Sequence, residues 1–275
     1  LSEFYWASFR WNQIHTRLDT LQSATINDML DIQLDNRSVF AEKTMPVILR
    51  TWKNHLRNDL EKHAFTILSD WDYEMDGHSP APTMYRYWYA LLEELTWEDD
   101  LGMDNDKFIW PYRDKMMELI LTNPESHWFD NKTTLQLETF SQLSQQAFHK
   151  MVSDLQSNYG GDIKTDWIWS KYQGTDINHV ANIPGMGVLD LPTSGGSDIP
   201  NATGTTFGPS WRFVVEMGEK KIAYGIYPGG QSGFPGSIYY DNMVDDWVHG
   251  VAYPLSFSDN PAEISGLTIK FGNGK

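Results

Sequence analysis

The sequence predicts an α+β fold in which a helical part comes first and β-strands come last. Up to residue 160, apolar side chains recur at spacings of three and four, as they do on one face of a helix. Beyond residue 160, glycine, proline, asparagine and serine accumulate, and runs of β-branched and aromatic residues follow. We therefore divide the chain into a helical region, residues 1–160, and a loop-rich and β region, residues 161–275.

Each expected helix is marked by its apolar spacing and by flanking capping or breaking residues. The expected helices are the stripe from Trp11 to Leu21, a helix capped by Thr25, a segment over 37–60, and segments 84–95, 112–121 and 133–159. Pro46 should break or kink its helix because proline has no N–H to donate. Gly160 should end the last helix, since glycine readily adopts the left-handed conformation found there.

Three runs in the second region predict strands, and a turn-rich stretch precedes them. The strands are expected over residues 212–217, 221–227 and 267–271. Residues 183–210 are rich in glycine, proline, asparagine and serine, which predicts a long ordered loop or a series of turns.

Composition narrows the classes of function. A formal net charge of −16 argues against nucleic acid as a partner, because phosphate binding needs a basic surface. The hydrophobic content of 40% predicts a folded protein, and no apolar run is long enough to span a bilayer. The absence of cysteine excludes disulfides, thiol catalysis and cysteine-ligated metals. The chain opens without a signal-peptide pattern and reads like the middle of a longer protein.

Residues 70–77 alternate carboxylates with other side chains and end in glycine, as calcium-binding loops do. Counting from Asp72, however, Ser79 stands at the hydrophobic position and Thr83 where the closing glutamate should be. We therefore interpret the segment as a turn that caps the following helix. The eight histidines show no metal-ligand spacing, so we expect no metal site in this chain.

Gly230-Gln-Ser-Gly233 is similar to part of the nucleophile elbow of serine hydrolases. Phe234 occupies the position of the second elbow glycine, and no helical pattern follows. The motif therefore predicts a tight glycine turn and not a catalytic serine.

The most informative pattern runs from residue 208 to residue 255, where two β-type runs are followed by a glycine-rich crossing and an aromatic tail. Its marker positions are Gly208, Trp211, Arg212, Gly229, Gly230, Gln231, Ser232, Gly233, Tyr240 and Trp247. This order resembles the C-terminal end of the β-subunit of penicillin acylases, which are amidases of the N-terminal-nucleophile (Ntn) hydrolase superfamily.

Further motifs extend the resemblance over nearly the whole chain. They are Tyr5-Trp6 with Arg10-Trp-Asn-Gln-Ile14, Gln33-Leu-Asp-Asn-Arg-Ser38, Leu68-x-x-Trp-Asp72 with Met75-Asp76, Trp169-x-Lys171, Gly195-Gly-x-Asp198 and Asn201-Ala202. The resemblance implies that residues 1–160 form a wall of the substrate cleft. It also implies that residues 161–275 complete the αββα sandwich of an Ntn hydrolase.

The resemblance further implies an amidohydrolase that cleaves linear amides. In such enzymes the N-terminal Ser, Thr or Cys of the β-subunit attacks the amide, with its own α-amine as general base. Residue 1 here is leucine, and Ser2 lacks the Ser-Asn-x-Trp context of the family. We therefore expect the nucleophile to lie upstream, and this chain alone to be inactive as a C-terminal fragment.

Arg10 is the catalytic-network residue that the resemblance assigns to this chain. It matches the family arginine that orients the nucleophile and the oxyanion-hole asparagine. The implied partners are the remainder of the precursor, meaning the α-subunit and the N-terminal part of the β-subunit, and a small acylated amide as substrate. The resemblance places most calcium ligands upstream, so Ca2+ is expected only in the full-length protein and no cofactor in this chain.

Two other functions remain open at this level. The 12 tryptophans and 13 tyrosines fit a binding module for carbohydrate or peptide. A non-catalytic structural relative of the same family fits the missing nucleophile equally well. The family resemblance and the lack of cysteine favour an extracellular or periplasmic location.

Overall fold

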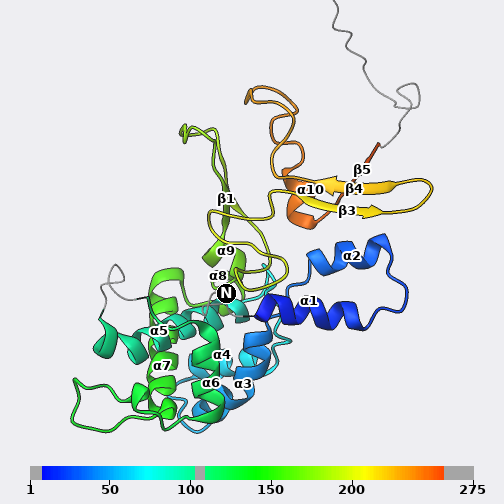
Figure 1. The fold of residues 1–275 in the computed structure, drawn as a ribbon. Coiled ribbons are helices and arrows are strands. Elements are labelled where there is room, and N and C mark those ends of the chain that lie inside the picture. Colours follow the sequence, from blue (N-terminus) through cyan, green and yellow to red (C-terminus); the bar gives the residue numbers. More distant parts are fainter. Residues whose placement is uncertain (1–7, 103–108, 257–275) are drawn as a thin grey trace, which may run out of the picture. The chain divides into compact units, whose positions relative to one another are not determined.

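The protein is described by a computed structural model that covers residues 8–102 and 109–256 (Figure 1). Its internal contacts divide the chain into two compact units. The first unit comprises residues 1–22 and 32–209, and the second comprises residues 23–31 and 210–275. The Tyr5-Trp6 motif, Ser2 and the strand expected over 267–271 lie outside the described residues.

Helices dominate the first unit, in agreement with the predicted α+β class. They are α1 (Phe9–Asp19), α3 (Val39–Trp52), α4 (Asp59–Ser69), α5 (Ala81–Leu101), α6 (Arg113–Thr122), the 3-10 turn η1 (His127–Phe129), α7 (Phe140–Tyr159), α8 (Ile163–Asp166) and α9 (Trp169–Gln173). The short helix α2 (Ile26–Gln33) begins in the second unit, and its last two residues belong to the first unit.

Two predicted helix ends are confirmed. Thr25 caps α2 reciprocally, because its N–H donates to Asp28 Oδ2 at 2.8 Å while the N–H of Asp28 donates to Thr25 Oγ1 at 3.2 Å. Gly160 follows α7 with a φ of 116°, a conformation that residues with a Cβ rarely adopt. The start of the last helix was predicted too early, since α7 begins at Phe140.

Of the two outcomes expected at Pro46, the break is wrong, because α3 continues through that residue to Trp52, and the kink stays a prediction. Met45 and Ile48 on either side are fully buried, so burial of this helix face outweighs the one hydrogen bond that proline cannot make. The segment expected over 37–60 contains two helices, because α3 ends at Trp52 and the side chain of Asn58 caps α4 by accepting a hydrogen bond from the N–H of Glu61 at 2.9 Å.

The apolar stripe predicted for α1 is not its buried face. Trp11 is 62% exposed and Leu18 is 42% exposed, whereas Phe9 and Gln13 are buried. Gln13 tolerates burial because its amide donates to the carboxylate of Asp35 at 2.8 Å. The polar Gln13 is therefore buried at a position of α1 that apolar periodicity alone would place in solvent.

The core of the first unit lies between α3, α5 and α7, and Figure 1 shows α5 and α7 side by side. The ring centroids of Trp52 and Phe148 are 4.4 Å apart, and those of Trp52 and Trp88 are 5.5 Å apart. Trp52 Nε1 donates to Ser144 Oγ at 2.9 Å, and Trp88 Nε1 donates to the Ser144 carbonyl at 3.1 Å. The large indoles are thus buried with their N–H groups satisfied.

Part of the predicted loop over 183–210 forms a strand. Strand β2 (Val188–Leu191) pairs antiparallel with β1 (Thr175–Ile177), which follows α9. The rest of that stretch forms the turns that its composition predicts. In the part of the chain that the structure describes, no helix combines the length and apolar character needed to cross a bilayer.

The second unit holds a three-stranded antiparallel sheet in the order β3–β4–β5. Strands β3 (Arg212–Glu216) and β4 (Ile222–Ile226) confirm two of the predicted strands. Strand β5 (Tyr253–Leu255) and the helix α10 (Val244–His249) before it were not predicted. Both are short, and short elements carry little periodic signal.

Candidate functional site

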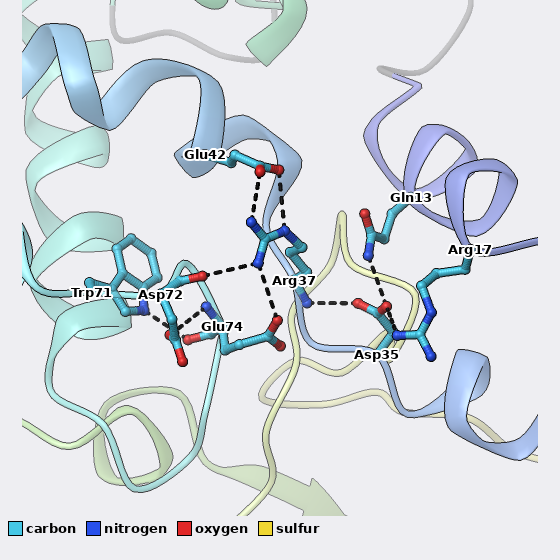
Figure 2. A network of polar contacts seen from close by, with 8 residues as sticks. All are labelled: Gln13, Arg17, Asp35, Arg37, Glu42, Trp71, Asp72 and Glu74. Atoms are coloured by element: carbon cyan, nitrogen blue, oxygen red, sulfur yellow. Dashed lines mark hydrogen bonds and ion pairs between the residues drawn. The ribbon is translucent and has the colours of Figure 1, made fainter. Parts of the chain in front are cut away.

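Asp35, in the Gln-Leu-Asp-Asn-Arg-Ser motif, joins α1 to the turn between α2 and α3 (Figure 2). Its buried carboxylate Oδ2 accepts hydrogen bonds from Gln13 Nε2 and from Arg17 NH1, both at 2.8 Å. Its Oδ1 accepts from the backbone N–H of Arg37 at 2.9 Å. Asp35 thus fixes the helix that carries Arg10 to the rest of the first unit.

Arg37 extends this network toward the loop that contains Trp71 and Asp72 (Figure 2). Its guanidinium donates to both carboxylate oxygens of Glu42, at 2.7 and 3.2 Å, and to the Asp72 carbonyl at 3.2 Å. Glu74 Oε1 lies 3.8 Å from its NH1. The arginine therefore links the first turn of α3 to the loop before α5, by geometry that suits the planar fork of a guanidinium.

The carboxylates of residues 70–77 act largely as turn residues. Asp72 Oδ1 accepts from the N–H of Glu74 at 3.0 Å, and Asp76 Oδ1 accepts from the N–H of His78 at 2.9 Å. Among the described residues, no group of three or more His, Asp or Glu side chains is placed to hold a metal ion. The calcium site that the family resemblance implies for the full-length protein, with its ligands mostly upstream of this chain, stays a prediction.

The Gly195-Gly-x-Asp198 loop is attached to the same junction. The N–H of Gly195 donates to the Met75 carbonyl at 2.8 Å, and the N–H of Asn201 donates to the Asp35 carbonyl at 3.0 Å. Gly195 has a φ of 94°, and a Cβ there would lie 2.1 Å from the Asn201 carbonyl oxygen. Motifs that are far apart in the sequence thus form one connected network in which glycine is required at position 195.

Arg10 lies in the first turn of α1, and its guanidinium donates from NH2 to the carbonyl of Ser197 in this loop. The side chain is exposed and borders a cavity of about 1150 Å³. The cavity is lined by Ser8, Phe9, Arg10, Trp11, Ile14, Glu93, Ile109, Trp110, Pro111, Tyr112, Arg113, Ser197 and Asp198. Arg10 is the predicted site residue that the fold places at this cavity.

Asp198 is the centre of a partly buried charge cluster at the cavity. Its carboxylate lies 2.8 Å from Arg113 NH1 and 3.9 Å from Arg86 NH1. Burial by itself would raise the pKa of Asp198, but Arg113 and Arg86 outweigh it and hold the pKa below its usual value. Asp198 is therefore held as a carboxylate next to the carbonyl that accepts from Arg10.

Glu93 also lines the cavity, and its pKa is shifted in the direction opposite to that of Asp198. Burial raises the pKa of Glu93 above its usual value, although the Tyr89 hydroxyl and Arg113 act in the opposite direction. The hydroxyl donates to Glu93 Oε1 at 2.6 Å, and Arg113 lies over the Tyr89 ring at 5.3 Å. The pKa values of two carboxyl groups that line one cavity are thus shifted in opposite directions.

Sequence reasoning missed Arg86, Glu93 and Arg113 as members of this cluster. A partial signal was present, because Arg86, Tyr89 and Glu93 recur at spacings of three and four and so share one face of α5. Nothing local, however, indicates that α6 and the 195–198 loop face the same side chains.

The tail motif residues of the second unit have structural roles. Arg212 is buried, donates from NH1 to the Trp247 carbonyl at 2.5 Å, and lies 5.3 Å from the centre of the Trp247 ring. Burial lowers the pKa of Arg212 to about 10. Trp211 is half exposed and stacks on Phe213 at 6.0 Å. Tyr240 donates its N–H to the Ser237 carbonyl at 3.1 Å.

The glycine-rich crossing is a tight turn, as predicted. Ser232 Oγ accepts from the N–H of Phe234 at 3.1 Å, which is a turn contact. Gly229 has a φ of 106°, and a Cβ on Gly230 would lie 2.1 Å from the Tyr239 carbonyl oxygen. Gln231 and Gly233 lie at bends of this crossing, and Gly208, in the first unit, lies outside the helices and strands.

Comparison with known proteins finds relatives of one kind. The chain is 25% identical over 206 residues to an acyl-homoserine lactone acylase QuiP of Pseudomonas fluorescens, and this alignment covers 69% of the chain and 25% of that relative. It is 25% identical over 212 residues to an acyl-homoserine lactone acylase QuiP of Pseudomonas syringae pv. tomato, with the same coverage. The chain thus spans about a quarter of the length of these curated relatives.

Similarity of fold reaches further than similarity of sequence. A thermostable penicillin G acylase from Alcaligenes faecalis matches 99% of this chain and 54% of its own with a TM-score of 0.63, at 12% sequence identity. The model of one family, described as Penicillin amidase, matches residues 1–263. The chain therefore belongs to the penicillin amidase family.

Proposed function

We propose that the full-length protein hydrolyses the linear amide bond of a small acylated amine and that this chain is its C-terminal part. The observation that carries the proposal is the position of Arg10, which borders a large cavity and is held by the Ser197 carbonyl. Family membership over residues 1–263 supports the reaction class. The nucleophile, an N-terminal Ser, Thr or Cys, is proposed to lie upstream of this chain.

Arg10 is proposed to orient the nucleophile's amine and the oxyanion-hole asparagine. A guanidinium remains charged at all relevant pH values, so a nearby amine is favoured in its neutral, basic form. That form is the one able to accept the proton of the attacking hydroxyl or thiol. The remaining partners are proposed to be the α-subunit and the upstream part of the β-subunit, with any Ca2+ bound by upstream carboxylates.

The test starts from the full-length precursor. Its mass is measured before and after incubation, and any new N-terminus is sequenced. Release of a Ser, Thr or Cys terminus upstream of Leu1 supports the proposal, and a precursor that stays whole and inactive contradicts it. An N-acyl-homoserine lactone is the first substrate to assay, because the similar curated relatives bear that name. Released amine is the readout, and benzylpenicillin is the second substrate.

The role of Arg10 is tested in the same protein. Arg10→Gln should lower kcat with little change in the thermal midpoint, because the side chain is exposed. Arg57→Gln is the matched control, since Arg57 is an exposed arginine outside the cavity lining. Equal kcat values for the two variants would remove Arg10 from the catalytic network.

A further inference from the structure

A second cavity of the first unit is formed by one face of α4, the loop after it, the start of α5 and the short helix α8. Its volume is about 470 Å³, which lies within the range of small-molecule sites, roughly 300–1,000 Å³. It shares no lining residue with the cavity at Arg10. A ligand of this second cavity can therefore be tested separately from the proposed hydrolysis.

One wall of the second cavity is apolar and continuous with the core. Trp71 lines it with only 7% of its surface exposed, and its Nε1 donates to the Glu74 carbonyl at 2.9 Å. The Trp71 ring packs against Tyr85, with the ring centroids 5.4 Å apart. The half-buried Ile67 and the buried Ala81 extend this surface. The wall is therefore preformed, as the apolar part of a ligand site usually is.

The rest of the lining carries charges of both signs. Asp70 and Asp72 are exposed carboxylates, and Lys164 is an exposed ammonium group. Across the described residues, the side chains of Asp70 and Lys164 make no hydrogen bond or ion pair. Asp72 uses only its Oδ1, which accepts from the N–H of Glu74 at 3.0 Å. Opposite charges thus line one cavity without neutralising each other, and both remain for a ligand.

The positive side of the cavity is held in place by the backbone. The N–H of Trp169 donates to the Ser79 carbonyl at 2.9 Å, which ties the chain after α8 to the residues before α5. Asp162 caps α8 by accepting from the N–H of Lys164 at 3.0 Å. The N-terminus of α5, at Ala81, lies in the same lining and carries the partial positive charge of a helix start. Lys164 and this helix end therefore both favour an anionic group.

We propose that the second cavity binds a free α-amino acid with an apolar side chain. The ammonium group of the ligand would lie at Asp70 and Asp72, and its carboxylate would lie at Lys164 and the start of α5. Its side chain would contact Ile67 and Trp71. A simple anion would face two carboxylates, and a simple cation would leave Lys164 without compensation. A zwitterion satisfies both sides of the lining.

The experiment is a calorimetric titration of the full-length protein with L-leucine, which should bind saturably. L-Leucinamide lacks the carboxylate and glycine lacks the apolar side chain, so each should bind at least about tenfold more weakly. Arg10→Gln should leave the affinity for L-leucine unchanged. Absence of saturable binding, or equal affinity for L-leucinamide, overturns the proposal. A loss of binding in Arg10→Gln also overturns it, because the ligand would then occupy the other cavity.

A pair of tryptophan variants locates the ligand. Thr66→Trp fills the second cavity and should abolish L-leucine binding. Ser69→Trp is the matched control, because Ser69 is also exposed on α4 but does not line the cavity. Each hydroxyl donates to the carbonyl four residues earlier, so both variants lose the same contact. Equal binding by the two variants would place the ligand elsewhere and contradict the proposal.

Charge variants identify the two ends of the ligand. Asp70→Asn and Lys164→Gln should each weaken L-leucine about tenfold, because each removes one charge-assisted contact. Lys164→Gln should leave the weak binding of L-leucinamide unchanged, since that ligand has no carboxylate. Lys43→Gln is the control, as Lys43 is an exposed lysine outside the lining. Affinities for L-leucine that match the parent protein in both charge variants would exclude a zwitterion site.

Discussion

Arg113 at the start of α6 lies 2.8 Å from the carboxylate of Asp198, in the loop that follows β2. The neighbouring carbonyl, that of Ser197, accepts from Arg10. The ion pair therefore fixes the backbone segment that holds the predicted catalytic-network arginine. Its partial burial also means that removing one partner leaves charge without compensation.

Asp198→Asn should destabilise the first unit by about 3 kcal/mol, because Arg113 and Arg86 would then repel each other without their shared carboxylate. Urea denaturation measures the loss as a lower midpoint. Asp59→Asn is the control, since Asp59 pairs with Lys62 on the surface and should leave the midpoint unchanged. Similar midpoints for the two variants would show that the Asp198 cluster contributes little.

Glu93→Gln should have a pH-dependent effect opposite to that of Asp198→Asn. The pKa of Glu93 is raised in the folded state, so its contribution to stability is full below its usual pKa near 4.5 and is lost as pH rises through the folded pKa. Relative to the parent protein, the variant should therefore gain stability between pH 4 and pH 7. Thermal midpoints recorded across that range test the sign, and a difference that does not vary with pH contradicts it.

The contribution of Asp198 to stability has the opposite dependence on pH. Its pKa is lowered in the folded state, so its contribution is full above its usual pKa near 3.8 and is lost as pH falls below that value. The stability difference between the parent protein and Asp198→Asn should shrink on acidification below pH 4. Urea titrations at pH 3 and pH 6 measure it, and an equal difference at both values would contradict the ion pair.

Asp35→Ala should cost about 3 kcal/mol of stability, because the change removes the acceptor of three hydrogen bonds and leaves the buried amide of Gln13 without it. Arg17→Ala should cost less than about 1 kcal/mol, since that side chain is 42% exposed. Chemical denaturation of both variants tests the order. A larger loss for Arg17→Ala would mean that the ion pair, and not the buried acceptor, stabilises the junction.

Gly195→Ala should destabilise by roughly 2 kcal/mol or more, because position 195 requires a positive φ and its Cβ would collide with the Asn201 carbonyl. Gly161→Ala is the matched control, as a Cβ there meets nothing within 4 Å. Thermal midpoints compare the two. Equal midpoints would show that the 195–201 loop rearranges without cost.

Ser144→Ala should cost only about 1 kcal/mol although the residue is fully buried. Trp52 Nε1 would lose the hydroxyl at 2.9 Å but keep the Ser144 carbonyl at 3.1 Å, so its N–H stays satisfied. Trp52→Leu, which leaves a cavity, should cost about 3 kcal/mol or more. Denaturation midpoints in the reverse order would show that the hydroxyl, and not ring packing, dominates this part of the core.

Local sequence signals were sufficient to predict most of the helices and strands of the chain. Apolar spacing located α5 and α6, Thr25 and Gly160 marked helix ends, and β-branched runs located β3 and β4. The glycine turn at Ser232 was also predicted from the sequence. These features depend on residues that are close together in the chain, so periodicity and turn chemistry predict them.

Tertiary packing decided the features that depend on distant residues. Pro46 stays within a helix because its neighbours are buried, and Trp11 is exposed because Gln13 finds Asp35 as a buried partner. The cavity and its charges come from α1, α5, α6 and the 195–198 loop. No local pattern brings these segments together. Burial and the meeting of charges are set by the whole fold, and so is the cavity at Arg10.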